Sequence, residues 1–399
     1  MGDSTQPTGV PPAAGPMAGL KVLDLATFIA APYCATLLAE FGADVVKVEL
    51  PGSGDPTRRF GSPTPCGDSL PWLSEGRNKQ SIAIDLRTPE GAALVRRLVA
   101  QADVLCENFQ PGTLERWGLG WESLSALNPR LVLLRVSAFG QDGPYRDRPG
   151  FGRIANAFAG LSYLAGYPDR PPVTPGSATL PDYLSGLYGA LGVLMALRAR
   201  DTTGRGQVID LGLYEGVLRI LDELIPAYDM FGTVRERMGP GTVNVVPHSH
   251  YPTADGRWVA IACTSDKIFA RLCTAMGRED LAAPDRFGPL AAREAARAQV
   301  DALVGDWTAS MSRAAVVGAC DAAQVPCGPV NAIDEIFADP QVQARGNIAR
   351  VFCDRLGRDL ALPEVVPRLS ETPGRIRHPG AALDADRADV LARWLGQTG

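Results

Sequence analysis

Short apolar segments alternate with helical segments through the first third of the chain. The expected strands are residues 21–26 (KVLDLA), 44–49 (DVVKVE), 103–106 and 131–136 (LVLLRV). Residues 31–41 and 89–101, which lie between strands, carry apolar side chains at helical spacing. This alternation is typical of βαβ units, whose strands pair in a parallel sheet. We therefore expect an α/β protein with a Rossmann-like parallel sheet.

The sequence argues against several classes of ligand. The turn after the first expected strand, ATFIAAP, lacks the GxGxxG that holds a dinucleotide, so no nucleotide redox cofactor is expected. The net charge is −5 and there is no long basic run, so we expect no nucleic-acid partner. No apolar run reaches the length needed to cross a bilayer, so no membrane partner is expected either. Residues 1–18 are rich in Pro, Gly and Ala and lack the pattern of a signal peptide, which predicts a disordered tail.

Cysteine usage indicates the compartment. The chain has eight cysteines and no CxxC pair, so neither a zinc site nor a disulfide framework is expected. Scattered, reduced thiols predict a cytoplasmic protein without a bound metal.

The pattern changes beyond residue 201. Residues 251–263 (YPTADGRWVAIAC) are typical of a β-hairpin, with Asp255-Gly256 as its turn. Helical segments are expected at 267–276, 291–309 and 312–323. Residues 225–325 are therefore predicted to form a second, smaller α/β domain.

One carboxylate precedes a long apolar helix. A loop rich in Pro, Gly and Ser leads to Asp182, and leucines then follow at positions 184, 187, 191 and 194, which is helical spacing. Gly186 and Gly189 keep this expected buried helix thin, so that another backbone can approach it. Asp182 is interpreted either as the helix N-cap or as an oriented nucleophile, since carboxylates can carry acyl groups covalently.

Five stretches together resemble a known family, the class III CoA-transferases, which include formyl-CoA:oxalate and carnitine CoA-transferases and the α-methylacyl-CoA racemases. They are residues 19–58, 78–86 (NKQSIAIDL), 107–112 (ENFQPG), 128–145 and 179–216. The resemblance implies a large domain built from residues 19–224 and from the chain end, with 326–399 as linker and return. The small domain, 225–325, is inserted between them. It also implies two interlocked subunits.

The resemblance assigns the chemistry to Asp182, which stands where the transferases of this family have their nucleophile. It implies that Asp182 attacks an acyl-CoA thioester, forms a mixed anhydride and then carries CoA as its own thioester. Formyl-CoA transferases have a four-glycine loop for the developing oxyanion. The comparable loop here is residues 238–242 (MGPGT), in which Gly239 and Gly241 are the expected catalytic donors.

CoA contacts are likewise implied by the resemblance. They fall on Ile84, Arg87, Asn108, Phe109 and Arg116, with Ile84 beside the adenine. CoA is expected as a substrate. Arg58 and Arg59 lie near these positions in sequence and are expected to be ordinary solvated charges.

The racemase alternative fails at one residue. Racemases carry a GHDINY stretch whose His is a base, and this chain has Phe151 at that position, so a transferase is expected. Ile29 replaces a Gln of the formyl-CoA branch, which favours a larger or more apolar acyl group. Arg153, His248 and His250 are the candidates for holding a second carboxylate. The two histidines alone are too few ligands for a zinc site.

Residues 152–183 resemble most closely the succinyl-CoA:dicarboxylate branch. The resemblance implies transfer of CoA from succinyl-CoA to an acid of the malate, citramalate, mesaconate or benzylsuccinate type. The alternatives are intramolecular transfer between the carboxyls of mesaconyl-CoA, and a non-catalytic CoA-binding subunit. The expected assembly is an interlocked homodimer or a heteromer with a paralogue.

Overall fold

The computed structural model describes residues 15–174, 176 and 179–397. The chain forms two compact units. The large unit comprises the described residues of Met1–Leu161, Ser177–Gly232 and Gln341–Gly399, and the small unit those of Ser162–Gly176 and Thr233–Pro340. Residues 1–14 of the expected tail lie outside the described part. Residues 15–18 are described, and the N–H of Met17 donates to the carbonyl of Phe41 at 3.0 Å.

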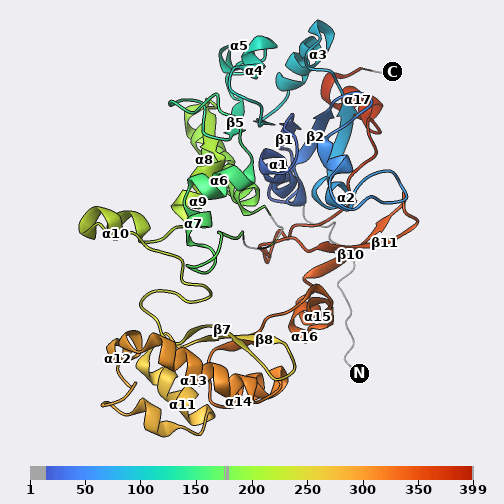
Figure 1. Cartoon of the computed structure of the whole chain (residues 1–399). Helices are drawn as coiled ribbons and strands as arrows, with labels where there is room; N and C mark the ends of the chain where they lie inside the picture. The colour runs from blue at the N-terminus through green and yellow to red at the C-terminus, as the bar shows by residue number, and fades with distance from the viewer. Residues whose placement is uncertain (1–14, 175, 177–178, 398–399) are drawn as a thin grey trace. The chain divides into compact units, whose positions relative to one another are not determined.

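The large unit is centred on a six-stranded parallel sheet in the order β3-β2-β1-β4-β5-β6. Figure 1 labels β1, β2 and β5 of this sheet. The strands are β1 (Lys21–Asp24), β2 (Asp44–Glu49), β3 (Lys79–Ala83), β4 (Val104–Glu107), β5 (Val132–Ser137) and β6 (Val208–Gly212). The expected α/β, Rossmann-like parallel sheet is confirmed. Its order reverses between β1 and β4, and ligands bind at such a point in open α/β sheets.

Helices cover both faces of the sheet, because successive side chains of a strand point to opposite sides. Val22 of β1 joins a core cluster with α1 (Ala30–Glu40) and α8 (Leu180–Thr203). Its neighbour Leu23 joins a second cluster with α3 (Pro89–Val99) and α17 (Arg387–Leu395). Helices from both ends of the chain therefore pack on the same sheet.

The helix α8 packs against α1 through its small residues. A Cβ on Gly186 would lie 2.9 Å from the carbonyl oxygen of Ala30, and one on Gly189 would lie 2.8 Å from Leu134. The close approach expected from the glycines is confirmed. The leucine face is different, since Leu187 and Leu191 remain half exposed. The expectation that no apolar run is long enough to cross a bilayer is wrong for α8, which passes that test by length and composition. The small-residue face of α8 packs in the core of the large unit.

The small unit pairs a three-stranded antiparallel sheet, in the order β7-β8-β9, with the helices α11 to α14. Its elements are β7 (His248–Pro252), β8 (Trp258–Ala262), β9 (Cys327–Pro329), α11 (Asp266–Ala275), α12 (Leu290–Ala295), α13 (Arg297–Ala309) and α14 (Arg313–Ala322). The hairpin predicted around Asp255-Gly256 is confirmed as β7 and β8. The single helix predicted over 291–309 is wrong, because Ala296 leaves helical geometry (φ −114°, ψ 27°) and divides it into α12 and α13.

The other helices, 3-10 turns and strands of the described residues complete the two units. They are α2 (Leu70–Glu75), α4 (Thr113–Arg116), α5 (Trp121–Leu127), α6 (Gly152–Phe158), α7 (Leu161–Leu164), α9 (Leu213–Arg219), α10 (Leu224–Phe231), α15 (Ile333–Ala338), α16 (Pro340–Ala344), the 3-10 turns η1 (Pro56–Arg59) and η2 (Glu279–Ala282), and the antiparallel pair β10 (Ile348–Cys353) and β11 (Arg358–Pro363).

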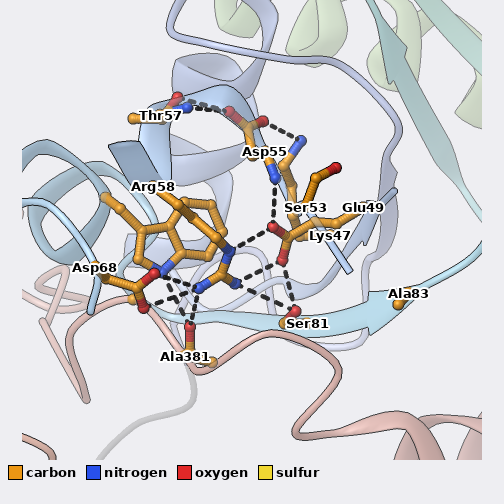
Figure 2. Close-up of polar contacts among 12 residues, drawn as sticks. Lys47, Glu49, Ser53, Asp55, Thr57, Arg58, Asp68, Ser81, Ala83 and Ala381 are labelled. Atoms are coloured by element: carbon orange, nitrogen blue, oxygen red, sulfur yellow. Dashed lines mark hydrogen bonds and ion pairs between the residues drawn. The ribbon is translucent and has the colours of Figure 1, made fainter. Parts of the chain in front are cut away.

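A buried ion-pair network anchors the loop after β2 (Figure 2). The guanidinium of Arg58 donates to both oxygens of Glu49 at 2.6 and 2.7 Å and to both oxygens of Asp68 at 3.0 and 2.9 Å. It also lies over the ring of Trp72, 3.8 Å from the centroid. Arg58 is only 4% exposed, so the expectation that it is a solvated charge is wrong. Two carboxylates compensate the burial of one cation.

The same network fixes the turn between β1 and α1. Lys47 Nζ lies 3.1 Å from Asp55 Oδ2, while Asp55 Oδ1 accepts the N–H of Phe28 at 3.2 Å. The hydroxyl of Thr57 donates to the carbonyl of Phe28 at 3.2 Å. Phe28 has φ +62°, a left-handed conformation that a bulky side chain rarely adopts. Buried charges thus hold a strained turn at the carboxyl end of β1, where the sheet order reverses.

Candidate active site

The crevice between β1 and β4 is closed at its base by a pair of hydrogen bonds. The side-chain oxygen of Asn108 accepts the N–H of Thr27 at 2.7 Å, and its amide nitrogen donates to the carbonyl of Thr27 at 2.7 Å. The loop after β4 is itself held by Glu107, which accepts the N–H of Phe109 at 2.8 Å and pairs with Arg135. Burial raises the pKa of Glu107 to about 7. The loops that follow β1 and β4 are therefore held together at the point where the strand order reverses.

A first cavity, of about 270 Å³, opens at the carboxyl ends of β1 to β4. Three of the expected CoA-contact residues line it, namely Ile84, Arg87 and Phe109. The Phe109 ring meets the ring of Trp117 edge-on at 5.1 Å, which gives the cavity an aromatic wall. Arg87 donates to both oxygens of Asp85 at 2.8 Å, so its charge is partly compensated.

A second cavity, also of about 270 Å³, adjoins the first, and Thr27 and Phe109 line both. Its walls include Asn108, Phe151 and Asp182. Phe151 is exposed, and its ring meets that of Phe28 at 6.2 Å. Residues from well-separated parts of the sequence thus border two adjoining cavities, together called the groove, and Asp182 is the only carboxylate among the described residues that line the second cavity.

Asp182 lies in the first turn of α8. The N-cap of that helix is Thr179, so the interpretation of Asp182 as the N-cap is wrong. The hydroxyl of Thr179 donates to Oδ2 of Asp182. Burial raises the pKa of Asp182 above its ordinary value, and the hydrogen bonds from Thr179 and from its own N–H oppose that rise. One oxygen is thus oriented by the protein, while the residue as a whole lines the cavity.

The N-terminus of α6 leaves room for that carboxylate. A Cβ on Gly152 would lie 2.4 Å from Asp182 Oδ2 and 2.4 Å from Thr179 Oγ1. Such separations are far below van der Waals contact, so any side chain at 152 must displace the pair. Glycine is therefore required here because a side chain has no room. Backbone conformation is not the reason, since Gly152 has no left-handed φ.

We expect Gly152→Ala to lower kcat about 100-fold, the cost typical of misplacing a reacting group by about 1 Å. KM for the CoA substrate should change little, because the first cavity is untouched. Steady-state kinetics separate the two constants. Gly318→Ala is the control, since a Cβ there meets no atom within 4 Å. Full activity in Gly152→Ala would contradict this reading of the geometry.

Other expected site residues lie outside the two cavities. Arg116 is exposed on α4 and donates to Thr113 at 2.8 Å. Ile29 is buried between Phe28 and Ala30, which line the second cavity, but it is not itself a lining residue. Arg153 is exposed on α6 and does not line the second cavity.

The remaining expected site residues belong to the small unit. His248 and His250 lie on the same side of β7 and line a separate cavity of about 610 Å³. The N–H of Gly239 donates to the carbonyl of Gly166 at 2.9 Å, and that of Gly241 to the carbonyl of Met238 at 3.2 Å. Both donors must leave these bonds before they can bind an oxyanion.

Among the described residues, no group of three or more His, Cys, Asp or Glu side chains is placed to hold a metal ion.

Three arginines line the groove without having been predicted. Arg59 borders the first cavity, and Arg146 and Arg148 border the second. The available signal was positional, because the segment DGPYRDRPG follows the carboxyl end of β5 in the sequence. Loops at the carboxyl ends of parallel strands carry the ligand contacts in this class of fold.

Comparison with known proteins gives a single family. The model of CoA-transferase family III matches residues 17–387. The chain is 55% identical to the succinyl-CoA–L-malate CoA-transferase beta subunit of Chloroflexus aurantiacus, covering 96% of this chain and 94% of the relative. It is 37% identical to the succinate–glutarate CoA-transferase of Agrobacterium fabrum, over 96% and 97% of the two chains. A crystal structure of a CAIB/BAIF family protein from Brucella suis superposes with a TM-score of 0.84 at 35% identity, covering 96% and 100%.

Proposed function

This chain belongs to CoA-transferase family III, and we propose that it moves CoA from succinyl-CoA to a second dicarboxylic acid through covalent intermediates on Asp182. The observation that carries the proposal is that Asp182 lines one of two adjoining cavities and that Ile84 and Arg87 line the other. A CoA molecule has a charged nucleotide end and a neutral arm that ends in sulfur. The groove suits that order, because its first cavity has two arginines and an aromatic wall, and Asp182 is the only carboxylate among the described residues that line its second cavity.

The proposed reaction needs no general base. A carboxylate oxygen of Asp182 attacks the thioester carbonyl, and the CoA thiolate leaves as a mixed anhydride forms. The thiolate then attacks the aspartyl carbonyl, which releases succinate and leaves CoA on Asp182 as a thioester. The acceptor carboxylate attacks that thioester and expels the thiolate as a second mixed anhydride forms. The thiolate then attacks the acceptor's carbonyl and releases Asp182 as a carboxylate. Each step exchanges one activated carboxyl for another, so the free energy of the thioester is conserved without ATP.

Phe151 supports transfer over racemisation. A racemase must remove and return the proton on the α-carbon of the acyl group, which requires bases on two sides. Phe151 supplies an apolar ring where the resemblance places one of those bases. Asp182 also argues against a silent CoA-binding subunit, because such a subunit has no use for an oriented carboxylate.

Two features support the proposal that the enzyme works as an interlocked dimer of this chain, or of this chain with a paralogue. Leu187 and Leu191 on α8 and Met230 and Phe231 on α10 are large apolar side chains that the single chain leaves exposed. Exposed apolar surface of this extent is typical of subunit interfaces. Relatives at 55% and 51% identity are named as beta and alpha subunits of one transferase.

The decisive experiment uses the purified chain alone. Succinyl-CoA is incubated with malate, citramalate, mesaconate, benzylsuccinate or glutarate, and the CoA thioesters are identified by mass. We expect one acid to yield a new thioester with one equivalent of succinate, and the mass in solution to be that of a dimer.

Each other outcome supports a different reading. Activity that appears only after a paralogue is added supports a heteromer. Conversion of mesaconyl-CoA to its isomer, without exchange of free acid, supports intramolecular transfer. Deuterium uptake at the α-carbon of a branched acyl-CoA supports a racemase. Absence of every product, with and without a paralogue, would contradict the proposed function.

A further inference from the structure

The loop between β5 and α6 brings two positive charges to the cavity that contains Asp182. Arg146 and Arg148 both line it, and among its described lining residues they are the only cations and Asp182 is the only anion. Neither arginine is among the residues that the resemblance assigns. Their charge requires a ligand that carries negative charge at this end of the groove.

CoA itself does not supply that negative charge here. Its phosphates lie at the nucleotide end, where the first cavity has Arg59 and Arg87. The pantetheine arm that leads to the sulfur is neutral. A cation in the cavity that Asp182 lines therefore has only the acyl group, or the acid that replaces it, as an anionic partner.

Arg148 is better prepared to bind an anion than Arg146. Arg146 already has a neighbouring carboxylate, with its Nε 3.5 Å from Asp147. Arg148 takes part in none of the ion pairs found among the described residues. Its guanidinium carbon instead lies over the ring of Tyr145, 3.6 Å from the centroid. Stacking orients the guanidinium while leaving its N–H groups, which point outward in the guanidinium plane, available.

The platform under Arg148 is itself fixed. The ring of Tyr145 makes edge contacts with Phe139 at 5.8 Å and with Phe158 at 6.0 Å. Phe158 belongs to α6, the helix whose first residue, Gly152, borders the carboxylate of Asp182. The same short helix therefore contributes to the position of both the cation and the nucleophile.

We propose that Arg148 binds the free carboxylate of the succinyl group, and then that of the acceptor acid, and so makes the enzyme selective for dicarboxylates. This inference rests on the proposed function, because it takes Asp182 as the point of acyl transfer. The acceptor attacks where the succinate has just left, so one cation serves both half-reactions. A planar guanidinium can bind a carboxylate through two parallel hydrogen bonds, which a monocarboxylic acyl group cannot accept.

The test compares two thioesters that differ at the far end of the acyl chain, succinyl-CoA and butyryl-CoA. Arg148→Ala should lower kcat/KM for succinyl-CoA about 10- to 100-fold, the worth of a charged hydrogen-bonded pair. It should change kcat/KM for butyryl-CoA less than about threefold. Arg148→Lys keeps the charge without the planar fork and should fall between the two. Arg205→Ala is the matched control, since Arg205 is an exposed arginine in the turn after α8 and lines neither cavity.

The outcomes separate this inference from the proposed function. Hydroxylamine trapping followed by peptide mass shows whether Asp182 is acylated in each variant. One contrary result is that Arg148→Ala leaves the ratio of kcat/KM for succinyl-CoA to kcat/KM for butyryl-CoA unchanged, either without loss or with an equal loss for both, while Asp182 is still trapped. That result would overturn the role of Arg148 and leave the transferase mechanism standing. Absence of any adduct at Asp182 in the unaltered protein would instead contradict the proposed function.

Discussion

Asp182→Asn is expected to abolish CoA transfer, with a loss of about 10⁴-fold or more, as is found when a covalent nucleophile is removed. The amide of asparagine has nearly the shape of the carboxylate but cannot attack a thioester. None of the other described residues that line the second cavity is an aspartate or glutamate, so no neighbour can substitute. The measurement is the rate of exchange between succinyl-CoA and labelled succinate, which needs no knowledge of the acceptor.

The control lies on the same helix. Asp201→Asn changes an exposed carboxylate in the last turn of α8 and should leave exchange unchanged. Hydroxylamine added after succinyl-CoA should mark Asp182 in the unaltered protein and in Asp201→Asn. Exchange above about 1% in Asp182→Asn, or an adduct on another residue, would show that the nucleophile lies elsewhere, because side reactions of an intact oxyanion site do not reach that level.

The same variant should not lose stability at neutral pH. Burial raises the folded-state pKa of Asp182. A carboxyl whose pKa is raised on folding stabilises the fold below its unfolded pKa, and that contribution is lost as the pH rises through the folded value. At pH 7 the ionised group is thus a cost, which the neutral asparagine removes. We expect Asp182→Asn to unfold at the same or a higher temperature at pH 7, with a smaller advantage at acid pH.

Arg58→Ala is expected to lower the free energy of unfolding by about 3–5 kcal/mol, the cost typical of removing one partner of a buried ion pair. The substitution leaves Glu49 buried and without its main cation, and it also removes the stacking on Trp72. A urea titration followed by far-UV circular dichroism measures the change. Arg58→Lys should recover part of the loss, because lysine keeps the charge but cannot bond Glu49 and Asp68 together.

An exposed pair in the small unit provides the comparison. Arg286 lies 2.7 Å from Asp280, and both side chains are about half exposed. Arg286→Ala should cost no more than about 1 kcal/mol, since solvent screens such pairs. If Arg58→Ala costs as little as Arg286→Ala, the network in Figure 2 contributes no more than a surface ion pair and does not anchor the loop after β2.

The order of strands and helices could be predicted from the sequence because it is written in local periodicity. Short β-branched and apolar runs such as LVLLRV, set between helical segments, are typical of buried parallel strands, and β5 lies where that run is found. The strand β3 was not predicted, because its polar residues resemble surface. Lys79 of β3 is nevertheless buried, because its ammonium donates to Asp24 at 2.9 Å and to the carbonyl of Pro32 at 2.6 Å, partners 55 and 47 positions away.

The candidate site, too, has residues that the sequence indicated and contacts that only the folded structure gives. The resemblance pointed to Asp182, and Ile84, Arg87, Asn108 and Phe109 do border the groove that ends there. Which oxygen of Asp182 is held, and by Thr179 rather than by the helix end, depends on the exact first turn of α8. Arg148 could not be distinguished from any surface arginine until folding brought it to the cavity that Asp182 lines.

The sequence by itself therefore determined the α/β class of this protein, its family and the residue types of its site, since these depend on periodicity and on motifs read along the chain. Only the tertiary structure decided which charges are buried, which face of α8 is left exposed and which arginines share a cavity with Asp182. The physical reason is that burial and proximity are set by segments that are distant along the chain. Arg58 shows this most simply, because Glu49, Asp68 and the carbonyl of Ala381 together turn an apparent surface charge into part of the core (Figure 2).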